Sequence, residues 1–381
     1  MKKTISKNII KKRTYRSKCS KLKRKLSNCC FLNWIVRENI KKKLKLIKYP
    51  KHNITRKKNY SPSKRIVINA PESLDYYNNS NFNKTNRFIY QLRDCVKNHK
   101  RKVLINFSDT NKISAAAMLS LLSEIDILIQ ESQYGKHSIS FNHPKNDKVL
   151  SILKQIGLYE LLGKTPKIDT KKYDDVSFWR YCSGHCSTPL IVKSMFVEIQ
   201  KEVAISASKQ LYRGFIEAMS NSVEHAYMND DNCISKNNTS KWWTFAGVRD
   251  NKLCVVVCDK GLGIPSTLPK TQGMDRIKDI LISLGANRNL VSDSNFIKAA
   301  TCLSKTRTGK DHRGKGLADI KSVIDTIGHG HLLIFSNKGE YRYKAHGKVN
   351  EVIRDKKTSI NGTIIEWIIP LQECSKENDV Q

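Results

Sequence analysis

Three polar side chains recur at every fourth residue in a segment that is otherwise patterned as a helix. Glu217, Asn221 and His225 lie within residues 214–227, and at about 100° per residue they share one side of the predicted helix with Glu224. The apolar residues that project to the other side are Phe215, Met219, Val223 and Ala226. A polar row beside a core costs free energy unless it has partners. A hydrated metal ion with a polyphosphate would supply them, so we expect a nucleotide site here.

Two glycine-containing segments supply what such a helix would need. The apolar run Leu253–Cys258 is typical of a fully buried strand, and Asp259, Gly261 and Gly263 follow it. The carboxylate can accept a hydrogen bond from an exocyclic amine such as that of adenine, and glycine lets backbone approach a base closely. Farther on, residues 313–317 read Arg-Gly-Lys-Gly-Leu and precede a helical pattern. Free N–H groups at a helix start favour phosphate.

A rival phosphate motif is excluded. Gly309 with Gly314 and Lys315 nearly completes a P-loop. Gly316, however, stands where a Mg²⁺-binding Ser or Thr is required, and no apolar strand precedes Gly309.

In order and spacing, roughly residues 200–371 resemble the ATP-binding boxes of the GHKL superfamily, which includes gyrase-type, Hsp90-type, histidine-kinase and anti-sigma-factor kinase members. Residues 217–221 resemble its N box, which implies Glu217 as general base and Asn221 as Mg²⁺ ligand. Residues 259–263 resemble the first glycine box, with the Asp on the adenine amino group, and residues 314–317 resemble the second, on the phosphates.

The closing strands of that domain resemble residues 330–336 and 362–370, with Thr363 near the base. The fold implied for residues 200–375 is the Bergerat α/β two-layer sandwich. The residues expected to hold ATP are Asn221, His225, Asp259, Gly261, Gly263, Lys310, Arg313, Gly314, Lys315, Gly316, Leu317 and Thr363. His225 has an equally weighted alternative, which is a helix-packing imidazole.

The interval of about 266–312 corresponds to the ATP lid of this family. Lys305, Arg307, Lys310 and His312 lie near its end, and Arg313 lies just after it; these cations could neutralise the γ-phosphate, although a solvated Lys-rich loop is as good an explanation for any one of them. The chain departs from the family at Ala318-Asp319, where many relatives place a second Gly-Leu pair. A less pliant phosphate turn is expected.

Strands and helices alternate between Arg65 and Gly163, which predicts an α/β layer over residues 63–164. The expected order is a strand at 65–70, a helix around 84–96, a strand at 103–107, an Ala-rich helix from Ser114, a short strand near Ile139 and a last helix ending near Leu158. The pattern resembles a STAS domain of the anti-anti-sigma type. The positions that correspond to its phosphoacceptor are Ala, so we expect Ser114 to be a helix N-cap and the domain to be a docking module for a protein partner.

Charge divides the chain unevenly. Residues 1–70 hold 24 Lys and Arg and one acid, Glu38, out of a net charge of +35 for 381 residues. A basic arm over residues 1–62, disordered or helical, would be drawn to nucleic acid or to an anionic surface; a passive tail is the alternative.

Residues 165–199 form a connector. The 11 Cys show no disulfide framework, residues 182–186 lack the usual zinc spacing, and no run of 18 apolar residues exists. We expect a cytoplasmic protein, in keeping with a bacterial regulator.

Three functions remain open from the sequence. The first is an Mg²⁺-dependent ATPase or ATP-gated switch that acts through the STAS-like domain. The second is a serine protein kinase, because residues 217–227 are especially close to the anti-sigma kinases; a histidine kinase is disfavoured, since no dimerising hairpin with a phosphoacceptor His precedes the domain. The third is a nucleotide-dependent nucleic-acid-binding regulator that uses the arm. A homodimer is also compatible with the sequence.

Overall fold

The computed structural model describes residues 20–21, 65–164, 176–178, 181–186, 190, 192–227, 241–285, 291–303, 316–346 and 348–371. The chain divides into two compact units, Met1–Pro62 and Ser63–Gln381. The described part of the second unit is mixed α/β. The predictions for the basic arm fall outside the described residues, apart from Ser20 and Lys21. Within the described ranges no helix is long and apolar enough to cross a membrane.

Residues 65–164 contain a small parallel sheet with helices. Its strands are β1 (Ile66–Asn69), β3 (Val103–Asn106) and β5 (Ile139–Asn142), in the order β1-β3-β5. The helices are α3 (Asn79–Arg93), continued by a π-helical turn at Asp94–Asn98, then α4 (Ala115–Glu131), α5 (Asp147–Gln155) and α6 (Leu158–Leu161). A 3₁₀ turn (Gly135–His137) follows α4. The predicted alternation is confirmed, although the short parallel pair of β2 (Ser73–Leu74) and β4 (Lys112–Ile113) was not expected.

Ser114 occupies the N-cap position of α4, as expected, with extended backbone angles. Its side chain makes no capping hydrogen bond, and its buried Oγ has no partner. The position was therefore predicted correctly, but the expected capping interaction is absent.

The C-terminal half contains an eight-stranded antiparallel sheet in the order β12-β11-β10-β13-β9-β8-β6, with β7 also paired to β8. Its strands are β6 (Val176–Phe178), β7 (Cys182–Gly184), β8 (Trp242–Arg249), β9 (Lys252–Asp259), β10 (His329–Ser336), β11 (Gly339–His346), β12 (Lys348–Asp355) and β13 (Thr363–Pro370). Asp250 and Asn251 join β8 to β9, both at positive φ. This conformation is the one that a tight hairpin requires, and Asp and Asn adopt it at low cost.

Six helices accompany this sheet in the described residues. They are α7 (Lys193–Glu202), α8 (Ile205–Glu224), α9 (Ile264–Gln272), α10 (Met274–Ser283), α11 (Asp293–Cys302) and α12 (Gly316–Ile327). Three of them lie in the interval that was assigned to a lid. In particular, α11 buries Phe296 and Ile297 in the same core as α8 and α12, so this part of the interval belongs to the folded body of the domain.

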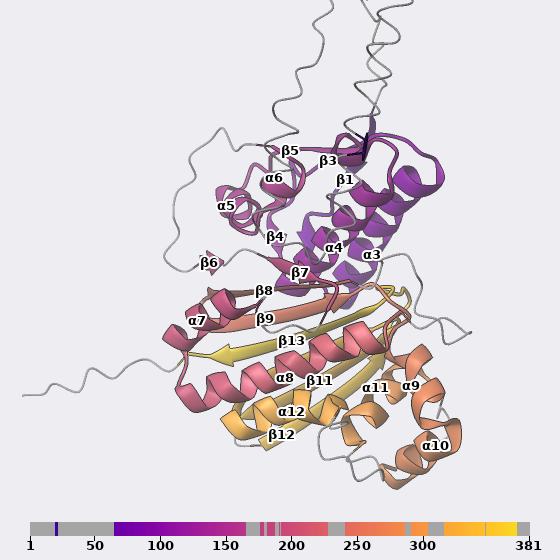
Figure 1. Cartoon of the computed structure of the whole chain (residues 1–381), viewed down its shortest axis with the longest axis vertical. Coiled ribbons are helices and arrows are strands. Elements are labelled where there is room, and N and C mark those ends of the chain that lie inside the picture. The colour runs from indigo at the N-terminus through magenta and orange to yellow at the C-terminus, as the bar shows by residue number, and fades with distance from the viewer. Residues whose placement is uncertain are drawn as a thin grey trace, which may run out of the picture. The chain divides into compact units, whose positions relative to one another are not determined.

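The central strands of the antiparallel sheet are apolar at most positions, and both of their faces are buried. In β9, Leu253, Val255 and Val257 pack with α8 and α12, which lie along one face (Figure 1). Cys258 and Val256 point the other way and join the core of residues 65–164, including α3 and α4. Residues 65–164 and the antiparallel sheet therefore share one hydrophobic core through this second face.

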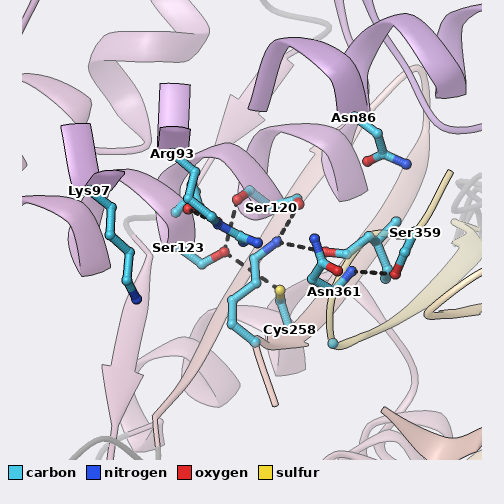
Figure 2. A network of polar contacts seen from close by, with 12 residues as sticks. Asn86, Arg93, Lys97, Ser120, Ser123, Cys258, Ser359 and Asn361 are labelled. Carbon is cyan, nitrogen blue, oxygen red and sulfur yellow. Dashed lines mark hydrogen bonds and ion pairs between the residues drawn. The ribbon is translucent and has the colours of Figure 1, made fainter. Parts of the chain in front are cut away.

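Polar contacts fix α4 on that second face. Ser120 and Ser123 on α4 face Cys258 of β9 and the turn that carries Ser359 and Asn361 (Figure 2). Lys260 Nζ, directly after β9, donates to Ser120 Oγ at 2.7 Å. Nearby, Lys241 forms a largely buried ion pair with Asp126, whose Oδ2 also accepts from Trp243 Nε1 at 2.8 Å.

A second group of polar contacts lies at β13. Glu366 is fully buried, and its Oε1 accepts from Tyr77 Oη at 2.6 Å and from Cys254 Sγ at 3.0 Å. Burial raises the pKa of Glu366 to about 6. Tyr77, from the N-terminal half of the unit, and Cys254 of β9 thus supply hydrogen bonds to a carboxyl group at the centre of an otherwise apolar strand.

Candidate functional site

A cavity of about 460 Å³ lies between α8, the end of β9, the helices α9 to α11 and the start of α12. Eight of the residues predicted to bind or act on a nucleotide line it: Glu217, Asn221, His225, Asp259, Gly263, Gly316, Leu317 and Thr363. Segments separated by more than 100 residues in sequence therefore meet at one site. The cavity also falls within the 300–1,000 Å³ range of small-molecule sites.

The helix α8 carries the polar row, and α12 holds it in place. Gly214 lets the two helices approach closely, because a Cβ built there would lie 2.5 Å from Val323 Cγ2 of α12. Phe215 and Met219 are fully buried on the opposite side of α8. The sequence spacing thus produces the expected result: one face of α8 is core, and the other lines the cavity.

Two polar atoms of this row are buried without a hydrogen-bond partner. They are Asn221 Nδ2 and His225 Nδ1. Unpaired buried polar groups are costly, and both residues line the cavity. A polar ligand in the cavity would remove this cost.

Asp259 ends β9 with an asymmetric set of contacts. Its Oδ1 accepts from the backbone N–H of Gly261 at 2.9 Å and of Thr363 at 3.3 Å. Its Oδ2 has one distant neighbour, Ser222 Oγ at 3.4 Å. Burial raises the pKa of Asp259 to about 6, against these hydrogen bonds, which lower it. Oδ2 is left to accept a hydrogen bond from a ligand.

Backbone packing around Asp259 depends on glycine. A Cβ at Gly261 would lie 2.0 Å from the carbonyl oxygen of Ala226, at the end of α8. That same oxygen accepts from Leu262 N at 2.6 Å. A Cβ at Gly362, before β13, would lie 2.2 Å from the carbonyl oxygen of Asp259. Gly261 therefore joins β9 to α8 and does not itself line the cavity.

Tyr227 also joins these elements. Its hydroxyl donates to the carbonyl of Lys241 at 2.5 Å and accepts from the N–H of Lys260 at 3.2 Å. It thereby links the end of α8 to both β8 and the Asp259 turn. Tyr227 is the last residue of the segment 217–227 that resembles the anti-sigma kinases, and the resemblance gave it no role.

Glu217 lies in an electronegative part of the cavity. Its pKa is raised by burial, then by the nearby carboxylates of Asp319 and Glu224, and the Gly316 N–H opposes this rise. Asp319 stands at the departure from the family pattern. Within the described residues, no three His, Cys, Asp or Glu side chains are close enough together to hold a metal ion.

The structure does not describe four of the predicted residues. Lys310, Arg313, Gly314 and Lys315 lie outside the described residues. Sequence reasoning also missed part of the wall: Ile264, Thr267, Leu268, Thr271, Gln272 and Arg276, on α9 and α10. Arg276 is the single Lys or Arg among the described lining residues, and it donates to Gln272 Oε1 at 2.8 Å. Pro265 at the start of α9 was the available signal for a helix there.

A comparison of the chain with protein-family models and with curated proteins found no match. The geometry of this cavity and the sequence resemblance are therefore the two indications of function.

Proposed function

We propose that this cavity binds ATP with Mg²⁺ and that the protein is an ATPase or an ATP-gated switch. The observation that carries the proposal is the convergence of Glu217, Asn221, Asp259 and Thr363 on one cavity. These are the residue types that a nucleotide site of the GHKL kind requires. They come from α8, the end of β9 and the start of β13, which are positioned by the buried sheet.

Adenine recognition is assigned to Asp259. Because Oδ1 is engaged by two backbone N–H groups, Oδ2 is the oxygen that would accept from the exocyclic amine. Thr363 lies beside it, with Oγ1 at 3.0 Å from Ser336 Oγ. A hydroxyl there can donate to or accept from a base.

Magnesium is assigned to Asn221 through its side-chain amide oxygen. The group fits, because Asn221 lines the cavity and the carboxylates of Glu217, Glu224 and Asp319 make this end of it negative. A polyphosphate would be repelled here without a cation. Bound Mg²⁺ would neutralise phosphate oxygens.

Glu217 is proposed as the general base. A raised pKa makes its carboxylate a better proton acceptor than an ordinary glutamate. It would take the proton of a water that attacks the γ-phosphate. A serine hydroxyl of a protein partner could take the place of that water, so the serine-kinase alternative uses the same residue, and the experiment below separates the two.

Residues 65–164 are proposed to transmit the nucleotide state to a protein partner. The supporting contact is Lys260 Nζ to Ser120 Oγ, because Lys260 is the neighbour of Asp259 in the cavity turn and Ser120 belongs to α4. The third alternative, a nucleic-acid-binding regulator, depends on residues 1–62. It predicts salt-sensitive binding that is lost when those residues are deleted.

The test is incubation of the protein with Mg²⁺ and γ-labelled ATP, alone and with cell lysate, while free phosphate and labelled protein are followed. Wild type is compared with Glu217→Gln, Asn221→Ala and a control, Glu198→Gln, on the surface of α7. Free phosphate that the first two variants lose and the control keeps supports the ATPase. Label on a partner serine supports the kinase, and binding without turnover supports the switch. Absence of ATP binding in wild type refutes the proposal.

A further inference from the structure

A second hollow lies on the surface between α7 and the first half of α8, which run beside each other (Figure 1). Its volume is about 640 Å³. The described residues that line it are Leu190, Lys193, Phe196, Val197, Gln200, Ser208, Lys209, Tyr212 and Arg213. None of the described residues of the nucleotide cavity is among them, so this groove is a separate site.

The floor and one rim of the groove are apolar. Phe196 stacks edge-on against Tyr212, with ring centroids 5.0 Å apart. Leu190 and Val197 are 75% and 46% exposed, which places them among the large exposed hydrophobic side chains of the described chain. Exposed apolar side chains grouped around a hollow mark a surface for a partner.

The groove also contains a polar atom with no partner. Ser208 is 1% exposed, and its Oγ makes no hydrogen bond. A serine within a helix can usually bond to the carbonyl four residues earlier. A ligand that reaches the base of the groove would meet an available hydroxyl.

Charge indicates what kind of ligand fits. Lys193, Lys209 and Arg213 line the groove, and no acid is found among its described lining residues. On α7, Lys193, Phe196, Val197 and Gln200 follow the spacing i, i+3, i+4, i+7, so cationic and apolar positions share one helix face. This face matches the apolar stripe and acidic flank of an amphipathic helix.

We propose that the groove between α7 and α8 docks an acidic amphipathic helix of a protein partner. The apolar side of that helix would cover Phe196, Val197 and Tyr212, and its carboxylates would pair with Lys193, Lys209 and Arg213. A nucleic-acid strand fits less well, because its phosphates would use the cations and leave the apolar floor exposed. The inference does not depend on the proposed nucleotide binding. It places a partner one helical turn before Glu217 on α8.

The probe is a fluorescein-labelled helical peptide of about 14 residues, or four turns, with Leu at the i, i+3, i+4, i+7 positions and Glu elsewhere. A scrambled peptide of the same composition controls for attraction to the strongly basic chain. Binding to the full-length protein is followed by fluorescence anisotropy, and the contact surface is located by hydrogen exchange. We expect the amphipathic peptide to bind at least about tenfold more tightly than the scrambled one and to protect α7 and residues 205–213.

Two double variants with the same change in charge test whether the peptide binds at this groove. Lys193→Glu/Lys209→Glu is expected to weaken the peptide at least about tenfold, whereas Lys84→Glu/Arg87→Glu, on the exposed side of α3, leaves it within about twofold. Val197→Asp removes apolar contact and is expected to weaken it similarly. Far-UV circular dichroism and the melting temperature verify that each variant is folded.

Several outcomes would overturn the proposal: absence of peptide binding, equal binding of the scrambled peptide, or equal loss in both charge variants. Displacement of the peptide by a single-stranded oligonucleotide, with the same sensitivity to Lys193→Glu/Lys209→Glu, would assign the groove to nucleic acid. Peptide binding that appears only when the chain is shortened to end at Leu371 would assign it to residues 372–381 of the same chain.

Discussion

At the scale of single residues, the two oxygens of Asp259 have different partners, and with the proposed function this difference would make nucleotide binding dependent on pH. Two backbone N–H groups occupy Oδ1, so a proton taken up by the carboxyl group resides on Oδ2. That oxygen is the proposed acceptor for the adenine amine. Because burial places the pKa of Asp259 at about 6, the carboxylate is ionised at pH 7.5 and protonated at pH 5.

We predict that the preference for ATP over inosine triphosphate falls as the pH is lowered through about 6, by up to about tenfold per pH unit below it. Comparing the two nucleotides cancels the titration of their phosphates, since they differ at the exocyclic amine. The measurement is isothermal titration with Mg²⁺ between pH 5 and 8. Lowering the pH does not destabilise the fold at this group, because its folded pKa lies above the ordinary value and protonation is favoured.

Glu217→Gln should keep this pH step, whereas Asp259→Asn should abolish both the preference and its pH dependence. A step that persists in Asp259→Asn would show that another group controls recognition.

Glycine is required at Gly261 and at Gly273 for two different physical reasons. Gly261→Ala would place a methyl group 2.0 Å from the carbonyl oxygen of Ala226, so we predict a loss of about 3 kcal/mol in the free energy of unfolding. Gly273, between α9 and α10, has open space around it but a φ of +78°. Gly273→Ala should therefore lose about 1 kcal/mol, from backbone strain alone. Urea denaturation gives both values, and equal losses would contradict the close approach of β9 and α8.

At the scale of elements, the position of α4 on the sheet depends on a buried ion pair. The side chains of Lys241 and Asp126 are 13% and 8% exposed. We predict that Asp126→Asn costs about 3 kcal/mol, because it leaves the Lys241 ammonium buried without its counter-charge. Asp126→Asn/Lys241→Met should recover most of that loss. Equilibrium unfolding of wild type, Asp126→Asn, Lys241→Met and the double variant completes the cycle.

The more exposed pair of Arg249 and Asp250 provides the comparison. These side chains are 35% and 61% exposed, and Asp250→Asn should change stability by less than about 0.5 kcal/mol. Asp250 adopts a positive φ that Asn tolerates equally well. A cost for Asp126→Asn no larger than this would mean that α4 is held by apolar packing alone.

The sequence predicted the strands and helices better than it predicted which helices cover each face of the large sheet. The run from Leu253 to Cys258 indicated a strand with both faces buried, and β9 has this property. It did not indicate that α3 and α4 cover the second face, because a continuous apolar run carries no alternation that would identify either covering layer. The informative residue was Glu366, a carboxylate within an apolar strand, since a buried charge requires a partner from elsewhere.

At the candidate site, too, the sequence predicted some of the lining residues and missed others. Periodicity on one helix identified Glu217, Asn221 and His225, and the glycine spacing identified Asp259. The wall formed by α9 and α10 was missed, because residues 266–312 were assigned to a lid by resemblance, although Ile277 and Leu281 follow a helical spacing and are buried. The turn at Gly273, which sets the direction of α10 relative to α9, follows from no local sequence pattern.

At the scale of the whole unit, residues 63–381 should unfold as one body although the sequence divides them into two domains. One cluster of buried side chains includes Ile105 of the small parallel sheet together with Phe245 and Phe335 of the large one, and Phe82 of α3 lies 5.9 Å from Phe335 between ring centroids. A separated C-terminal part would expose this face to water. Exposure of that much apolar surface is unfavourable.

We predict that Ile105→Val in β3 and Ile324→Val in α12, both fully buried, each lower stability by about 1 kcal/mol and shift one common transition. Native-state hydrogen exchange tests this, because in a single cooperative unit either substitution lowers the opening free energy of the most protected amides in both halves equally. If Ile105→Val affected exchange in residues 65–164 alone, the halves would open independently. In that case the hydrogen bond between Lys260 and Ser120 would join the two halves without coupling a partner bound at residues 65–164 to the proposed nucleotide cavity. Equal effects would mean that residues 65–164 and the large sheet unfold together. A change at Asp259 and a change on α4 would then each alter the same free energy of unfolding, which a switch that acts through this sheet requires.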